Sequence, residues 1–112
     1  METETDKYII TSEVHIEFED SFVNDFTHFK GRTADGYAFY GIIDPQPTEV
    51  GIVTPEHPEG SRVVKLNVCT PDDACAYDYC RALFMPAEDE ADREAVTEIL
   101  AALEAAICAA GE

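Results

Sequence analysis

The sequence predicts an α+β domain in which a small antiparallel β-sheet of about four to five strands is packed by one short helix and two C-terminal helices. Two observations support this class. Apolar and polar residues alternate over much of residues 8–69, whereas apolar residues recur at helical spacing after residue 70. Because the strand-like segments precede the helical ones, we expect antiparallel pairing and C-terminal helices that cover one face of the sheet.

The length and composition suit a single domain over residues 8–112, preceded by an acidic, disordered tail at residues 1–7. The chain has 112 residues, of which 46% are hydrophobic, enough to form a core. Neither a signal peptide nor a stretch of membrane-spanning length is recognisable. These features predict a cytoplasmic protein that does not enter a membrane and whose four cysteines remain thiols.

The N-terminal part is predicted to form one strand over residues 8–18 and then a short helix between residues 20 and 31. In the strand, apolar side chains alternate with polar ones. In the helical segment, apolar residues have helical spacing and Gly31 follows as an end signal. Alternatively, the chain from Phe29 forms the first arm of a hairpin that turns at Asp35–Gly36.

The middle of the chain is predicted to be rich in strands. The returning arm of the first hairpin covers residues 37–43 and ends where prolines break the pattern. A second hairpin is predicted from residues 49–54 and 62–69, joined by a loop with two prolines and a glycine. The segment should therefore supply most of the sheet.

The C-terminal third is predicted to form two helices. Thr70 and Pro71 suit the cap and the first position of a helix that ends near Pro86. The last helix has an apolar stripe from Val96 to Ile107 and ends near Gly111. Its glutamates are expected off that stripe, on the exposed face: Glu94, Glu98 and Glu104.

The charge is strongly negative and unevenly distributed. Twenty-four acidic residues face seven Lys and Arg, which gives a formal net charge of −17. Residues 1–25 and 71–112 carry most of the acids, whereas residues 26–70 have five acids and four bases. Direct nucleic-acid binding needs clustered Lys and Arg and is therefore not expected. A charge of this size indicates either a cationic partner or a salty environment.

Two acidic arrays and one tyrosine make up the predicted partner-binding surface. Carboxylates on one helix face would lie about 6 Å apart, and those on one strand face about 7 Å apart, close to the spacing of phosphates. The acidic run at residues 88–94 also has an explanation that needs no partner, because the helix dipole favours acids at a solvent-exposed helix N-terminus. Tyr40 is added as an aromatic anchor. The predicted residues are Glu13, Glu17, Glu19, Asp20, Glu88, Asp89, Glu90, Asp92, Glu94, Glu98 and Tyr40.

No motif predicts a catalytic residue, a metal ligand or a cofactor. The cysteines at 69, 75 and 80 are spaced six and five residues apart, unlike the pairs of structural zinc sites, and are interpreted as buried thiols. The three histidines stand alone on separate segments and are interpreted as incidental. Glycine-rich phosphate loops are absent from the sequence.

The sequence therefore predicts a non-enzymatic interaction protein that docks on a basic protein surface. One form of this hypothesis is a nucleic-acid mimic that inhibits a DNA- or RNA-handling complex. Anti-CRISPR and anti-restriction inhibitors often act in this way, and the analogy is one of charge and size only. Two alternatives stay open: a salt-adapted, halophilic domain, and a small metal or thiol protein that uses Cys69, Cys75 and Cys80. An exposed apolar stripe on the last helix would indicate a homodimer.

Overall fold

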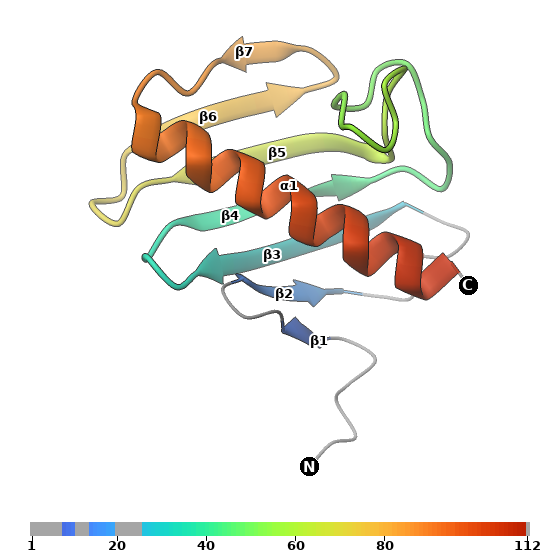
Figure 1. Cartoon of the computed structure of the whole chain (residues 1–112), viewed down its shortest axis with the longest axis horizontal. Helices are drawn as coiled ribbons and strands as arrows, with labels where there is room; N and C mark the ends of the chain where they lie inside the picture. The colour runs from blue at the N-terminus through green and yellow to red at the C-terminus, as the bar shows by residue number, and fades with distance from the viewer. Residues whose placement is uncertain (1–7, 11–13, 20–25, 112) are drawn as a thin grey trace.

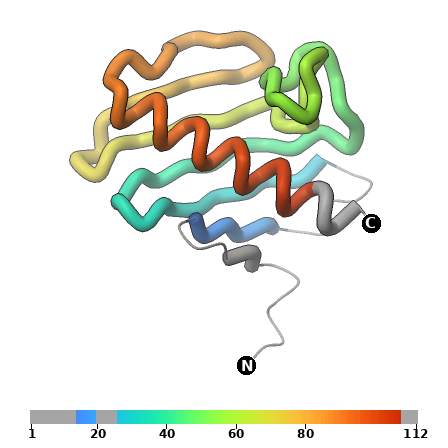
Figure 2. Tube along the Cα trace, viewed as in Figure 1, coloured from blue at the N-terminus to red at the C-terminus, as the bar shows by residue number. Residues whose placement is uncertain are grey.

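The computed structural model describes residues 8–10, 14–19 and 26–111, and the side chains of residues 14–19 and 26–107. Within these ranges the chain forms a seven-stranded antiparallel sheet and a C-terminal helix (Figure 1). The strands lie side by side in sequence order (Figure 1), and the coloured trace of Figure 2 follows the same order from residue 14 onward. The elements are β1 (Tyr8–Ile10), β2 (Val14–Phe18), β3 (Thr27–Thr33), β4 (Ala38–Ile43), β5 (Val63–Cys69), β6 (Cys75–Cys80), β7 (Leu83–Met85) and α1 (Glu90–Gly111).

The core lies between the sheet and α1, which runs diagonally across one face (Figure 1). Strand side chains that point to this face are buried, as the alternating burial of β2 illustrates. The helix contributes its predicted apolar stripe, in which Ile99 and Leu103 are fully buried together with Leu66 of β5. Fully burying one such side chain stabilises the fold by about 1.5–3 kcal/mol. Because the stripe packs on the chain's own sheet, it does not form the exposed face that would have indicated a homodimer.

Two glycines allow large aromatic rings to pack in the centre of the sheet. Phe29 lies opposite Gly41, and Gly31 lies opposite Phe39, across β3 and β4. A Cβ atom added to Gly31 would come within 2.5 Å of the Phe39 ring, and one added to Gly41 within 2.6 Å of the Phe29 ring. The two rings also contact each other, with centroids 6.2 Å apart. Each glycine therefore provides the space that a cross-strand phenylalanine fills.

The prediction for the number and kind of elements was wrong, although the α+β class is correct. The sheet has more strands than the four to five expected, and one C-terminal helix takes the place of two. Residues 8–18 were predicted as one strand, yet β1 and β2 are separate strands that pair with each other, Tyr8 opposite Glu17. The predicted short helix is also wrong where it can be tested, because residues 27–31 belong to β3; residues 20–25 lie outside the described residues.

The residues of the first predicted C-terminal helix instead form the turn after β5, then β6 and β7. Thr70 closes a turn: its carbonyl accepts a hydrogen bond from the Asp73 amide, and its amide donates to the Ala74 carbonyl. The backbone of Asp73 has φ of 73°, a left-handed conformation that ends a turn and cannot continue a helix. Beyond it, Tyr77 and Tyr79 pack against the core from alternate positions of β6.

Residues 44–62 form a folded loop between β4 and β5, where one strand of a second hairpin had been predicted. Backbone hydrogen bonds join this loop to itself and to the start of β5, including Ile52 N–H to the Val63 carbonyl at 2.9 Å. Its only regular pairing in the described chain is an isolated bridge between Thr54 and His57. The Asp35–Gly36 turn between β3 and β4 was predicted correctly, with Gly36 at φ of 97°.

In the part of the chain that the structure describes, no helix has the length and apolar character needed to cross a membrane.

Candidate functional site

The start of α1 presents an acidic surface beside the β3–β4 turn. Six acids occupy positions 88–98, with Arg93 as the only base among them. Glu90, Glu94 and Glu98, which recur every four residues on one helix face, line a shallow groove of about 660 Å³. Asp35 and Tyr37 from the β3–β4 turn line the same groove. We call these lining residues, together with Glu88, Asp89 and Asp92, the acidic groove.

The acids also explain why the helix begins here. Asp89 immediately precedes the first helical residue, a position that favours aspartate, and its carbonyl accepts the backbone N–H of Arg93 at 2.9 Å. Glu90 and Asp92 lie in the first turn, where the helix dipole favours negative charge. The Arg93 guanidinium donates to the backbone carbonyl of Glu88. Arg93 also lines the groove, so this base lies among the carboxylates while its described contact satisfies a backbone carbonyl.

Tyr37 joins the two walls of the acidic groove. Its hydroxyl donates a hydrogen bond of 2.6 Å to Oδ1 of Asp92, across 55 residues of sequence. This bond, together with burial and the nearby charges of Asp92, Asp89 and Asp35, raises the pKa of Tyr37 to about 12. The tyrosine therefore stays neutral and fixes the turn against the helix at all physiological pH values. The sequence analysis missed this residue, because nothing local indicates that its hydroxyl meets a helix.

Glu17 and Glu19, two of the acids predicted in the N-terminal part, lie on the opposite face of the sheet from α1. Glu17 of β2 lies 3.8 Å from the Lys30 ammonium, and Glu19 lies 3.4 Å from the His28 ring. Because Lys30 lies beside Glu17 and the His28 ring lies beside Glu19, these two acids do not form an isolated acidic array. Two further predicted residues, Glu13 and Asp20, lie outside the described residues.

Tyr40, the predicted aromatic anchor, also lies on this open face of the sheet, where half of its surface is exposed. Lys65 places its ammonium 5.9 Å from the centre of the Tyr40 ring. With Lys30 and Arg32, three of the seven Lys and Arg of the chain point to this face from β3 and β5. The structure thus places Tyr40, Glu17 and Glu19 on the open face of the sheet, where bases accompany acids, and the predicted acids of residues 88–98 on the helix side.

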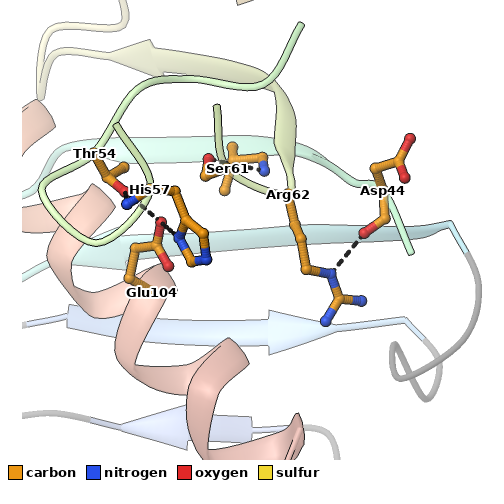
Figure 3. A network of polar contacts seen from close by, with 7 residues as sticks. Asp44, Thr54, His57, Ser61, Arg62 and Glu104 are labelled. Atoms are coloured by element: carbon orange, nitrogen blue, oxygen red, sulfur yellow. Dashed lines mark hydrogen bonds and ion pairs between the residues drawn. The ribbon is translucent and has the colours of Figure 1, made fainter. Parts of the chain in front are cut away.

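A buried carboxylate ties the 44–62 loop to the helix (Figure 3). Glu104 is only 6% exposed, although the sequence analysis had placed it on the exposed face, so that prediction was wrong. The Thr54 hydroxyl donates a 2.6 Å hydrogen bond to its Oε2, and Nδ1 of His57 lies 3.1 Å from the same atom. His57, interpreted as incidental from the sequence, is therefore one of two partners of a buried acid.

The three cysteines that the sequence analysis considered together are not gathered at one point. Cys69 and Cys75 pair across β5 and β6, whereas Cys80 lies opposite Lys65 at the other end of β6. Cys75 is exposed and the other two are half-buried, so the interpretation as buried thiols was wrong for Cys75. Among the residues with described positions, no group of three or more His, Cys, Asp or Glu could hold a metal ion.

Comparisons with known proteins found no matching family model, no matching curated protein and no matching solved structure.

Proposed function

We propose that this protein is a non-enzymatic interaction protein whose acidic groove docks on a basic surface of another protein. The observation that carries the proposal is the concentration of acids at the start of α1, within a groove braced by Tyr37 and Asp92. A groove of about 660 Å³ lined by several carboxylates suits the ammonium or guanidinium groups of lysine and arginine side chains. Carboxylate arrays of this kind steer basic partners at long range.

The narrower form of the proposal takes the partner to be a nucleic-acid-handling protein. Carboxylates four residues apart on a helix lie about 6 Å from each other, similar to the spacing of phosphates along a strand. A basic groove that normally holds nucleic acid would meet a comparable row of negative charges in Glu90, Glu94 and Glu98. On this view the protein acts as an inhibitor by occupying that groove.

Salt adaptation is the alternative explanation of the charge, and the position of the bases argues against it. A surface adapted to high salt would be acidic on every exposed side. The open face of the sheet instead presents the bases Lys30, Arg32 and Lys65 among its acids, and Lys30 lies 3.8 Å from Glu17. The segregation of charge supports a directed surface over uniform acidification.

A capture experiment with charge-matched variants tests the proposal. The full chain is immobilised and incubated at low salt with a lysate of the organism that encodes it, and captured proteins are identified by mass spectrometry. In the groove variant, Glu88, Glu90 and Glu94 are replaced by glutamine. In the control variant, the exposed loop residues Glu49, Glu56 and Glu59 are replaced by glutamine, which removes the same charge.

The proposal expects a basic protein that the native chain and the control variant capture and the groove variant loses. Equal loss in both variants would mean that only net charge matters. Equal capture by all three proteins would mean that the groove is not the contact surface. Either result would overturn the proposal.

A further inference from the structure

Cys69 and Cys75 lie directly opposite each other on β5 and β6, next to the turn that joins these strands. Opposite residues of an antiparallel pair have Cα atoms about 4.5–5.5 Å apart, and disulfides usually join Cα atoms about 4.4–6.8 Å apart. The register, which shifts at an irregularity between Val68 and Cys69, therefore places the two cysteines opposite each other at a separation typical of disulfide-bonded residues.

One amide side chain contacts both thiols. Sγ of Cys69 donates to Oδ1 of Asn67 at 3.4 Å, and Nδ2 of Asn67 donates to Sγ of Cys75 at 3.7 Å. Asn67 and Cys69 are two residues apart on β5 and point to the same open face of the sheet. Because both sulfur atoms contact the same amide, they lie close to each other on the open side of the hairpin, where Cys75 Sγ also contacts the Tyr77 carbonyl.

The turn beside the pair is closed and keeps the register fixed. The Thr70 amide donates to the Ala74 carbonyl at 2.7 Å, and the Ala74 amide donates to the Thr70 hydroxyl at 3.2 Å. These two bonds join the residues that directly follow Cys69 and precede Cys75. The two thiols are therefore held opposite each other before any reaction takes place.

We propose that Cys69 and Cys75 form a dithiol site that reacts with low-molecular-weight disulfides and closes reversibly to an intramolecular disulfide. Nothing in this inference depends on the proposed docking function, and the two can fail independently.

The reaction would start at Cys75, because its side chain is exposed. Burial raises the pKa of the Cys69 thiol, and the nearby Cys75 and Asp73 add to this effect, so Cys69 is the less reactive thiol at the start. The Cys75 thiolate attacks one sulfur of the reagent, the reagent's S–S bond breaks, and one thiolate leaves. The Cys69 thiolate then attacks the Cys75 sulfur of this mixed disulfide and releases the second thiolate.

The electrons and protons balance over these two reaction steps. Two protein thiols are oxidised to one disulfide, and one reagent disulfide is reduced to two thiols. The two protons that Cys69 and Cys75 lose pass through the solvent to the two released thiolates. Excess small-molecule thiol reverses both steps.

Peptide mapping tests the proposal with oxidised glutathione as the probe. The reduced, folded full chain is treated with the probe, free thiols are alkylated, and the chain is cleaved on the N-terminal side of aspartates. Cuts before Asp72, Asp73 and Asp78 separate the three cysteines onto different peptides. The expected product is a disulfide-linked pair of the Cys69 and Cys75 peptides, with the summed mass of the two reduced peptides less two hydrogen atoms. Dithiothreitol should convert it back to the two free-thiol peptides.

Single serine variants assign the order of the steps. In Cys69→Ser, a stable glutathione adduct should accumulate on Cys75 at least tenfold above its level in the native chain, because the resolving thiol is missing. In Cys75→Ser, oxidised glutathione should label Cys69 at least tenfold more slowly than it labels Cys75 in the Cys69→Ser variant. Cys80→Ser is the matched control and should behave like the native chain. A native chain that keeps the Cys75 adduct, or that forms its disulfide with Cys80 or Cys108, would overturn the proposal.

Discussion

Glu104 fixes the position of the 44–62 loop relative to α1. A carboxylate buried in apolar surroundings is costly unless hydrogen bonds compensate for the lost water. Here both partners come from one short stretch of the loop, Thr54 and His57, about fifty residues away in the sequence. The loop and the helix therefore stabilise each other, since the loop supplies the Thr54 hydroxyl and the His57 ring and the helix supplies the Glu104 side chain.

Replacing Thr54 by valine should destabilise the protein by about 2 kcal/mol. The change keeps the shape of the side chain and removes the donor of a 2.6 Å bond to a buried carboxylate, and hydrogen bonds to charged groups contribute about 1.5–3 kcal/mol. Chemical denaturation measures the free energy of unfolding. The exposed Thr97, changed to valine, is the matched control. Equal stability of the two variants would show that the Thr54 bond contributes nothing.

Tyr37 makes the stability of the protein sensitive to alkaline pH. Its pKa is raised to about 12 in the folded chain, against 10.0 for a free tyrosine, mainly because its hydroxyl donates to Asp92. The unfolded chain therefore loses this proton at a lower pH than the folded chain. The contribution to stability is complete below pH 10 and is lost as the pH rises through about 12.

Tyr37→Phe should reduce this alkaline sensitivity and lower stability at neutral pH by about 1 kcal/mol, the contribution of one partly buried hydrogen bond. Denaturation curves at pH 7 and at intervals up to pH 12 measure both effects. Tyr77, whose pKa burial also raises to about 12, remains in the variant, so part of the alkaline loss should persist. An unchanged profile in the variant would contradict a role for the Tyr37 hydroxyl.

At the scale of elements, the central strands depend on the match between glycine and phenylalanine on β3 and β4. Gly41→Ala should destabilise the protein by about 2–3 kcal/mol, because the added Cβ would lie 1.9 Å from the Lys65 carbonyl oxygen and 2.6 Å from the Phe29 ring. Thermal or chemical unfolding measures the loss. Ala38→Ser, on the open face of the same strand, should change stability by less than about 0.5 kcal/mol. A neutral Gly41→Ala would contradict the tight packing of this pair.

Local sequence patterns predicted some elements correctly and others wrongly. The last helix was predicted correctly because its apolar stripe is continuous over several turns and needs no distant partner to be recognised. Thr70 and Pro71 suit both the start of a helix and a tight turn, and the spacing of apolar residues after them suits both as well. What selects the strand is pairing with β5, where Tyr77 meets Val68, and such pairing is not visible in the local sequence.

The candidate site was predicted in part for the same reason. The acidic run 88–98 was recognised because its charge and helical position are properties of the local sequence. The bracing bond from Tyr37 was missed because it spans 55 positions, and Glu104 was misplaced because a glutamate among alanines looks like an exposed helix residue. Nothing in the sequence distinguishes Glu17, which has Lys30 beside it, from the acids that line the groove at the start of α1.

At the scale of the whole molecule, the sheet separates two surfaces of different charge. The helix side carries the acidic groove, and the open side carries Lys30, Arg32 and Lys65 around Tyr40. A net charge of −17 also makes the compact state repel itself, and salt screens that repulsion over distances of about 10 Å at 0.1 M. Salt should therefore strengthen folding and weaken docking at the same time.

Folding at low salt separates the docking account from salt adaptation. We expect the protein to remain folded at about 0.05 M salt, because its buried apolar core supplies the main driving force for folding, and to gain only modest stability at higher salt. Circular dichroism during thermal unfolding at several salt concentrations measures this. Unfolding at low salt with recovery in molar salt would instead support the halophilic alternative.

The most direct test of the docking account is the salt dependence of binding to the captured partner, measured for the native chain, the groove variant and the loop control. We expect the affinity of the native chain and of the control to fall steeply between about 0.05 and 0.5 M salt, with a clearly flatter dependence for the groove variant. An affinity that does not change with salt, or a slope that the groove substitutions leave unchanged, would contradict the account.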